Sequence, residues 1–388
     1  MFMRDYHAHE IGNVAVLGHS GCGKTSIVET MAYRAGAIGQ IGNIQSGNTI
    51  SDYSAEEIAR QSSINLSIVP IEWDNCKINL IDVPGTFDFV GETEAALSVC
   101  ESALIICPSY AGISAGTKQA MYKARDKGKI IYINGLDNPN SDYPTKLQQL
   151  KDTYGKGIAP IQVPIMDNNK MVGYVNVAKM EGRMFENGQT HVAPIPEDMM
   201  DEVLPIKAMI DEAVANTSDE LLEKYLEEEP FTKEEISNAL RQGVTDGSLI
   251  PVLCGTDRIG ISIILNSMCA FFDSANHPKN ALIVKDLKKD DEKILECNED
   301  SPTSLFVFKT ITDPFVGKTS YFKVTSGTLY TGMTLYNPKE KEDEKIPLSE
   351  IKPLSSHIRF LRIFFDSYKG KSGERDIRIL HDNLIEKG

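Results

Sequence analysis

The stretch from Gly18 to Thr25 limits the possible fold of this chain more than any other part of the sequence. It matches the pattern G-x-x-x-x-G-K-[ST] at every fixed position, follows an apolar run that begins at Val14, and precedes a helix-like segment from Ser26 to Arg34. A strand, a glycine-rich loop and a helix in that order form a phosphate-binding loop. An ordinary glycine turn that matches by chance is the alternative, and both flanks argue against it.

Backbone N–H groups in such a loop, together with the positive end of the helix dipole, attract an anion. We expect Lys24, otherwise facing solvent, to reach the β- and γ-phosphates of a nucleotide and to act in catalysis. We expect the Thr25 hydroxyl to ligate Mg²⁺. The predicted nucleotide-binding residues of this loop are Gly18, His19, Ser20, Gly21, Cys22, Gly23, Lys24, Thr25 and Ser26.

Length and composition narrow the class of protein. A chain of 388 residues can hold two or three domains, and 40 basic against 55 acidic side chains give a net charge of −15, which argues against direct DNA binding. Seven cysteines without a C-x-x-C pair indicate reduced thiols. The sequence shows no signal peptide and no apolar run of the roughly 20 residues that span a bilayer. We expect a soluble, cytoplasmic monomer without membrane contacts.

The segment from Lys77 to Gly85 predicts a strand that ends at Asp82 and is followed by a Pro-Gly turn. An acid at this point can hold Mg²⁺ through water, and Gly85 is expected beside the nucleotide. Asp-x-Pro-Gly is also common turn chemistry, so alone it is a weak signal. Its place downstream of a phosphate-binding loop strengthens it.

Further strands are predicted over Ile64–Pro70, Ala103–Cys107 and Lys129–Ile133, and a helix over 115–127 separates the last two. Strands that alternate with helices argue for a parallel, doubly wound sheet. The predicted fold class is α/β, a phosphate-loop domain with a mostly parallel sheet, an inserted α+β subdomain and a small β-barrel after it.

The strand that ends at Ile133 leads into Asn134-Gly-Leu-Asp137. A carboxylate at Asp137 can accept both the N1–H and N2–H₂ donors of guanine, and adenine offers no such pair. Asn134 and Asp137 are therefore predicted nucleotide-binding residues, although these four residues alone more often make only a turn. A later strand leads to Gly255 and Thr256, whose backbone N–H groups are expected to face the base.

The rest of the sequence divides into further segments. Residues from about 158 to 250 predict the inserted subdomain, whose helical part from Pro196 to Arg241 is acidic. Short alternating strands and a Ser-Gly turn from Ser304 to Asn337 predict the small β-barrel. The predicted divisions are a nucleotide-binding domain over 1–272, a linker over 273–300, the start of the barrel domain over 301–351 and a divergent basic tail over 352–388.

With these segments the chain resembles elongation factor G and its paralogues among the translational GTPases, over about residues 11–350. The resemblance implies a ribosome-associated GTPase of translation elongation that uses GTP or GDP and Mg²⁺. It also places Ser63 at the position of the family's switch-I threonine, which ligates Mg²⁺ and reports the γ-phosphate. The matching segments beyond the phosphate-binding loop are Asp82–Gly85, Glu223–Leu226, Ala239–Gln242, Pro251–Gly255 and Thr312–Lys318.

Three positions depart from the family pattern. The family has a histidine that positions the attacking water on the ribosome, and this chain has Thr86 at that position. The imidazole that the family uses in catalysis is therefore missing. Where the family has a lysine that stacks on the base, this chain has Gly135. Where the family has a Gly-Ser-Ala loop, this chain has a loop that contains Asp257. Together the three changes predict relaxed nucleotide affinity and slower hydrolysis.

The family pattern also stops after about Ile351. The segment from Lys352 to Gly388 holds eight Lys or Arg against five Asp or Glu. A truncated or frameshifted gene is one explanation, and a basic segment that touches RNA is the other. Three functions stay open: a GTPase with weakened catalysis, a switch that binds GTP or GDP without significant hydrolysis or translocase activity, and an inactive remnant.

Overall fold

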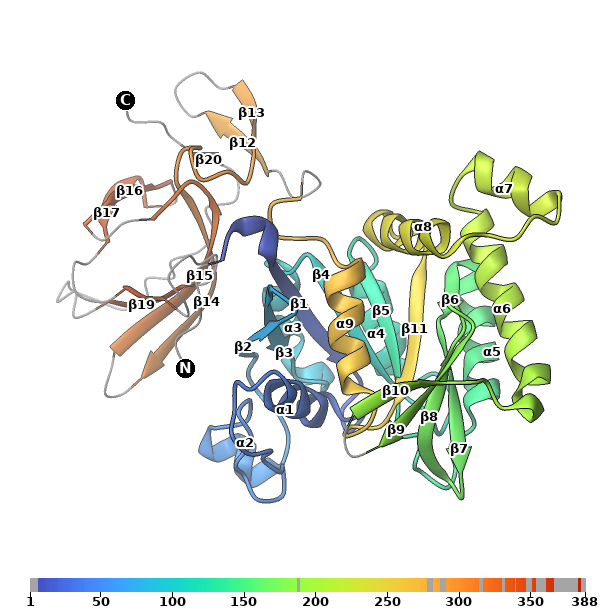
Figure 1. The fold of residues 1–388 in the computed structure, drawn as a ribbon. Coiled ribbons are helices and arrows are strands. Elements are labelled where there is room, and N and C mark those ends of the chain that lie inside the picture. The colour runs from blue at the N-terminus through green and yellow to red at the C-terminus, as the bar shows by residue number, and fades with distance from the viewer. Residues whose placement is uncertain are drawn as a thin grey trace. The chain divides into compact units, whose positions relative to one another are not determined.

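The computed structural model describes residues 6–186, 189–277, 282–286, 291–313, 317–329, 332–338, 340–346, 351–353, 361–365 and 383–384 (Figure 1). The chain forms two compact units. The larger unit comprises Val14–Asp74 and Ile78–Asp273, and the smaller one comprises Met1–Asn13, Asn75–Lys77 and Ser274–Gly388.

A seven-stranded sheet forms the centre of the larger unit, in the order β2-β3-β1-β4-β5-β11-β6 (Figure 1). The pairs β1–β4, β4–β5, β5–β11 and β11–β6 are parallel. Its strands are β1 (Ile11–Gly18), β2 (Ser67–Trp73), β3 (Cys76–Asp82), β4 (Ser102–Pro108), β5 (Gly128–Asn134), β6 (Ile158–Pro160) and β11 (Ile250–Gly255).

Continuous apolar sequence explains the central strands, because β5 and β11 are buried along their whole length. Strands and helices alternate along the chain, which confirms the predicted α/β class with a mostly parallel sheet. The helices of this part are α1 (Lys24–Arg34), α2 (Ala55–Arg60), α3 (Val90–Leu97), α4 (Ala115–Lys123), α5 (Tyr143–Tyr154) and α9 (Ile261–Phe271), with short 3₁₀ turns at Phe87–Phe89 and Gly155–Gly157.

The strand β2 begins at Ser67, three residues later than the sequence predicts. The N–H groups of Ile64, Asn65 and Leu66 donate to side-chain carboxylates, so they do not join the sheet. The loop before β2 is therefore longer than expected.

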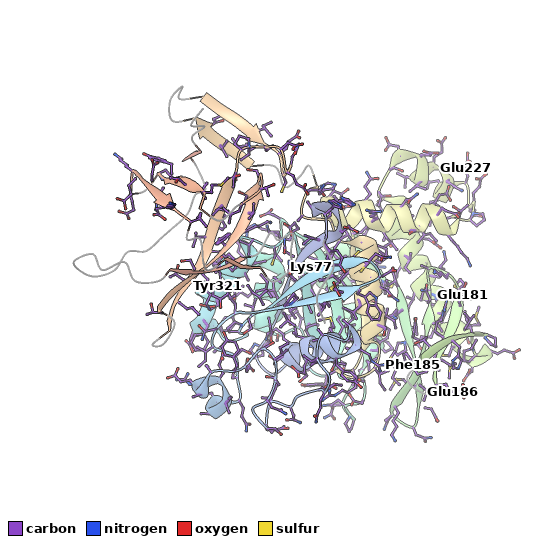
Figure 2. The ribbon with its side chains drawn as sticks, turned by 60° about the vertical axis from the view of Figure 1, so that its left-hand side comes forward. Lys77, Glu181, Phe185, Glu186, Glu227 and Tyr321 are labelled. Atoms are coloured by element: carbon purple, nitrogen blue, oxygen red, sulfur yellow. The ribbon has the colours of Figure 1, made fainter. Side chains whose placement is uncertain are left out.

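An inserted subdomain lies in sequence between β6 and β11. It combines an antiparallel sheet in the order β10-β9-β8-β7 with three helices (Figure 1). Glu181 lies on β9 (Figure 2). Its carboxylate forms an ion pair at 3.1 Å with Lys233, at the start of α8. Because β6 pairs with β11, the subdomain begins after Pro160. Its elements are β7 (Gln162–Asp167), β8 (Lys170–Asn176), β9 (Glu181–Glu186), β10 (Gln189–Ala193), a 3₁₀ turn (Glu197–Met199), α6 (Met200–Ala215), α7 (Asp219–Leu226) and α8 (Lys233–Asp246).

Among its described residues, the smaller unit contains a 3₁₀ turn at Ala8–Glu10 and several small sheets. Their orders are β14-β15-β19-β18, β13-β12-β20 and β16-β17. Leu305, Phe322, Val324 and Ile346 form its buried core cluster. The strands are β12 (Leu282–Asp286), β13 (Asp291–Leu295), β14 (Ser304–Asp313), β15 (Gly317–Ser326), β16 (Thr334–Asn337), β17 (Glu342–Lys345), β18 (Ile351–Pro353), β19 (Leu361–Phe365) and β20 (Asn383–Leu384).

Several segments of the smaller unit bear on the predicted divisions. The strands β12 and β13 lie within the stretch 273–300 that the sequence predicts as a linker, and β19 and β20 lie within the predicted tail. Residues 314–316 of the Thr312–Lys318 segment, and the tail outside 352–353, 361–365 and 383–384, lie outside the described residues. Where the structure describes the chain, no helix has the length and apolar character needed to cross a bilayer.

Candidate nucleotide-binding site

The phosphate-binding loop connects β1 to α1. Gly23, the residue that precedes α1, has a φ of 94°, and a Cβ atom there would collide with Asn134 Nδ2. A Cβ on Gly85 would collide with Lys24 Nζ and come within 2.6 Å of Ser20 N. The turn after β3 therefore lies directly on the loop, and glycine is required where the two segments meet.

Lys24 lies within the loop, and the expectation that it faces solvent is wrong. Its side chain is buried, and Nζ donates hydrogen bonds to the carbonyl oxygens of Gly18 and His19, both at 3.0 Å. These two acceptors hold the ammonium at the loop. Phosphate oxygens can replace them, since charge-assisted hydrogen bonds to phosphate are stronger than those to a neutral carbonyl.

Three distant segments meet at Thr25. Its hydroxyl donates to Asp82 Oδ2 at 2.8 Å and lies 3.2 Å from the Ser63 hydroxyl oxygen. All three side chains are buried. We call the loop from Gly18 to Thr25, together with Ser63 and Asp82, the phosphate end of the site.

A second buried carboxylate, Asp52, lies beside these groups. Burial raises the pKa of Asp52, and a hydrogen bond from the Ser63 hydroxyl lowers it. Burial also raises the pKa of Asp82, to about 6, although the nearby Lys24 ammonium and the Thr25 hydroxyl act in the opposite direction. Neither Asp52 Oδ1 nor Asp82 Oδ1 has a hydrogen-bond partner among the described residues.

These oxygens fit Mg²⁺. The ion takes oxygen ligands, keeps several waters, and is commonly held by one or two protein groups together with substrate phosphates. Two hydroxyls and two partly unsatisfied carboxylates meet that description, and a cation would offset the cost of burying the two charges. Among the described residues, no group of three or more His, Cys, Asp or Glu side chains could hold a metal ion.

The second part of the site, which we call the base end, consists of Asn134–Asp137 and Gly255–Asp257. Asn134 Nδ2 donates to the carbonyl oxygen of Cys22 at 2.9 Å, which ties the end of β5 to the phosphate-binding loop. The Leu136 N–H donates to the carbonyl oxygen of Gly255 at 3.1 Å. Asp137, the predicted guanine-binding residue, is exposed.

The loop after β11 differs from expectation at Thr256. Its N–H donates to the carbonyl oxygen of Ile259 at 3.0 Å, so in this conformation it does not face a base. The Tyr132 hydroxyl lies within hydrogen-bonding distance of two backbone carbonyl oxygens of the same turn, 2.8 Å from that of Thr256 and 2.9 Å from that of Ile259. Asp257 lies 3.9 Å from the Arg258 guanidinium, which partly offsets the negative charge expected to repel a base.

Thr86 follows directly on Gly85 and precedes the 3₁₀ turn at Phe87–Phe89. It is half-buried, and its hydroxyl makes no capping hydrogen bond to that turn. His19, in the phosphate-binding loop, has its ring centre 6.4 Å from that of Phe87. The turn that carries Thr86 therefore borders the phosphate end.

The structure brings together the predicted residues of the phosphate end, with Gly85 and Asn134 beside them. It adds Asp52, and also Glu57, which binds the backbone just after Ser63. A Ser-x-x-Glu pattern from Ser54 to Glu57 marks a helix start in the sequence, and the structure shows that capping box. No local signal marks Asp52, because its partners come from other segments.

Two comparisons with known proteins agree with this geometry. The family model of the elongation factor Tu GTP binding domain matches residues 9–274. The chain is also similar to a protein of Thermus thermophilus, whose crystal structure has 26% sequence identity and a TM-score of 0.77. That alignment covers 95% of this chain and 55% of the other, so this chain spans little more than half the length of its relative. With a phosphate-binding loop closed by Ser63 and Asp82, and a family match over most of its length, the chain belongs to the family of the elongation factor Tu GTP-binding domain.

Proposed function

We propose that this chain is a guanine-nucleotide-binding GTPase of the elongation factor G type that acts on the ribosome and hydrolyses GTP slowly. The observation that supports it most is the meeting of Thr25, Ser63 and Asp82 at one point. A nucleotide bound there would be contacted by the loop before β2 and by the end of β3. The subdomain between β6 and β11, with its Glu223–Leu226 and Ala239–Gln242 segments, supports the elongation factor G type.

In this proposal the side chains contact different parts of the nucleotide or its Mg²⁺ ion. Mg²⁺, when bound, neutralises charge on the β- and γ-phosphates. The Thr25 and Ser63 hydroxyls would ligate it directly, and the Asp82 and Asp52 carboxylates would hold its waters. Lys24 would exchange its carbonyl acceptors for phosphate oxygens, and Asp137 would accept the guanine donors.

Hydrolysis depends on the residue at position 86. Phosphoryl transfer leaves little covalent chemistry to the protein, so the rate depends on water orientation and charge stabilisation. The Thr86 hydroxyl is shorter than an imidazole and accepts a proton poorly at neutral pH. A positioned proton-transfer group contributes about 10²–10⁴-fold, so its loss predicts slow turnover.

The test is single-turnover GTP hydrolysis with saturating ribosomes for the parent and Thr86→His. We expect the variant to react about 10²-fold faster or more, with GTP affinity changed little because position 86 adjoins the phosphates and not the base. Thr153→His, at an exposed position of α5, controls for an added imidazole. If the parent already equals its histidine variant, Thr86 does not limit the chemical step.

The same threonine favours a second candidate, a switch that binds GTP or GDP without significant hydrolysis. Both functions need the phosphate end, and they differ only in turnover. Ribosome-stimulated multiple turnover by the parent supports the GTPase. Tight nucleotide binding with no turnover, with and without ribosomes, supports the switch.

A further inference from the structure

The backbone that follows Ser63 is held by two carboxylates. Ile64 N and Asn65 N both donate to Glu57 Oε1 at 3.0 Å, and Leu66 N donates to Glu92 Oε2 at 2.7 Å. Side-chain carboxylates thus accept hydrogen bonds from three consecutive N–H groups, and the strand β2 begins at the next residue, Ser67. We call Glu57 and Glu92 the carboxylate clamp.

Glu57 is well suited to this task. Its side chain is buried, and its second oxygen accepts the Ser54 N–H at 3.1 Å as part of the helix cap. Burial raises its pKa, but hydrogen bonds from the backbone and from the Ser54 hydroxyl outweigh burial and leave the pKa below its usual range. The group is therefore an acceptor-only carboxylate at neutral pH, with bonds to N–H groups on both sides of Ser63 along the chain.

Glu92 brings in a different segment. It lies on α3, which follows the turn that carries Thr86 and the 3₁₀ turn at Phe87–Phe89. Its bond to Leu66 joins the loop of Ser63 to the helix next to the catalytic position. This bond is a direct connection between the two segments.

The loop of Ser63 needs such support. Between the end of α2 at Arg60 and the start of β2, Gln61 adopts a left-handed conformation with a φ of 52°, which costs a non-glycine residue conformational energy. The Ser63 hydroxyl nevertheless lies 3.2 Å from Thr25, within reach of the same point as Asp82. Errors of about 1 Å in such a group weaken its action strongly.

We propose that Glu57 and Glu92 are positioning residues that hold the Ser63 hydroxyl against Thr25 and couple its loop to the segment that carries Thr86. This inference rests on the proposed function, because it assumes that Ser63 acts on Mg²⁺ beside a γ-phosphate. A carboxylate that only stabilised α2 would affect folding and not the response to Mg²⁺.

The test measures the affinity for a hydrolysis-resistant GTP analogue, with Mg²⁺ and with EDTA, in Glu57→Gln and in the matched control Glu56→Gln, whose side chain is exposed on the same helix. Glutamine at 57 has one acceptor oxygen and sets an amide N–H against backbone N–H groups. We expect a loss of about tenfold in affinity with Mg²⁺ and less than about twofold in EDTA. The control should match the parent in both conditions.

A double-mutant cycle with Ser63→Ala separates positioning from general stability. If Glu57 acts through Ser63, Glu57→Gln should cost nothing further in the Ser63→Ala background. An equal loss with Mg²⁺ and EDTA, or a full additional loss in that background, would overturn the inference.

Glu92 supplies an independent variant pair in case Glu57→Gln does not fold. Glu92→Gln keeps an oxygen for Leu66 N and should retain the Mg²⁺-dependent affinity, whereas Glu92→Ala should lose about tenfold. Equal behaviour of the two variants contradicts the clamp. A parent protein without any Mg²⁺-dependent affinity would instead count against the proposed function, so the two failures are distinguishable.

Discussion

The phosphate end and the base end of the site differ in the burial and hydrogen bonding of their side chains. At the phosphate end, Lys24, Thr25, Ser63 and Asp82 are all buried and make hydrogen-bonding contacts of 2.8 to 3.2 Å. At the base end, Asp137 is exposed and Gly135 has no side chain. On the proposed function, triphosphate recognition would therefore be preorganised in this chain, and base recognition would depend largely on one exposed carboxylate.

The contrast has a physical cause. A buried charge must be matched by partners, so the phosphate end needs several groups to be right at once. An exposed carboxylate is solvated by water and can be retained while its neighbours change. We therefore expect base selectivity to be the weaker property of this site, and variants at the two ends to differ in the size of their effects.

The largest effect is expected for Lys24→Ala. It removes the ammonium that would bind two phosphates, and hydrogen bonds to charged groups contribute about 1.5–3 kcal/mol each. We expect GTP and GDP affinity to fall by at least about 100-fold in calorimetry, with cooperative unfolding retained. Lys118→Ala, an exposed lysine on α4, is the matched control. Unchanged affinity in Lys24→Ala would end the assignment of the phosphate-binding loop.

The next effect concerns Asp82. Its pKa of about 6 exceeds the ordinary 3.8, so the folded state binds the proton more tightly, and stability falls as pH rises from about 4 to about 6. Without nucleotide and Mg²⁺, Asp82→Asn should therefore be more stable than the parent at pH 7.5, by about 3 kcal/mol, and equal to it near pH 4. Urea unfolding across this range is the measurement.

With Mg²⁺ and GTP the parent should instead be more stable than Asp82→Asn, because a neutral amide oxygen holds the waters of the ion less strongly than a carboxylate does. Asp126→Asn, which neutralises an exposed aspartate, should show neither change. A parent protein that gains stability between pH 4 and 6 relative to Asp82→Asn would show that its carboxylate is already compensated without metal.

A smaller effect is expected at the base end for Asp137→Ala. A bidentate contact to a base contributes about 1–3 kcal/mol of discrimination, so GDP affinity should fall by about tenfold while ADP affinity stays the same. Titration of fluorescent GDP and ADP measures both. Equal affinities for the two nucleotides in the parent would mean that Asp137 does not read the base.

The smallest effect is expected for Gly135→Lys. The added stem could stack on a base, but the φ of 83° disfavours a side chain, and its Cβ would lie 3.5 Å from the Tyr110 ring. We expect GDP affinity to rise by about threefold at most. Gly135→Ala carries the same backbone strain without the stem and is the control. Weaker GDP binding by Gly135→Lys than by Gly135→Ala would indicate that Tyr110 already occupies this space.

Features that depend on residues close together in the sequence could be predicted from the sequence. The phosphate-binding loop needs glycines, a lysine and a threonine at set spacings, so Gly18–Thr25 could be recognised without a structure. The central strands β5 and β11 could be predicted because continuous apolar runs suit strands buried on both faces. The start of β2 could not, because the acceptors for Ile64, Asn65 and Leu66 lie on two helices outside that segment.

By itself, then, the sequence determined the α/β class, the phosphate-binding loop and the acid at the end of β3, since spacing and hydrophobic pattern are short-range properties. Only the tertiary structure decided that Lys24 is buried against its own loop, that Asp52 joins Asp82, and that Thr256 N–H is already bonded. It also revealed the carboxylate clamp around the loop of Ser63. Each of these depends on which distant groups share a low-dielectric interior, and burial there sets both the pKa of a carboxylate and the cost of leaving a hydrogen bond unmade.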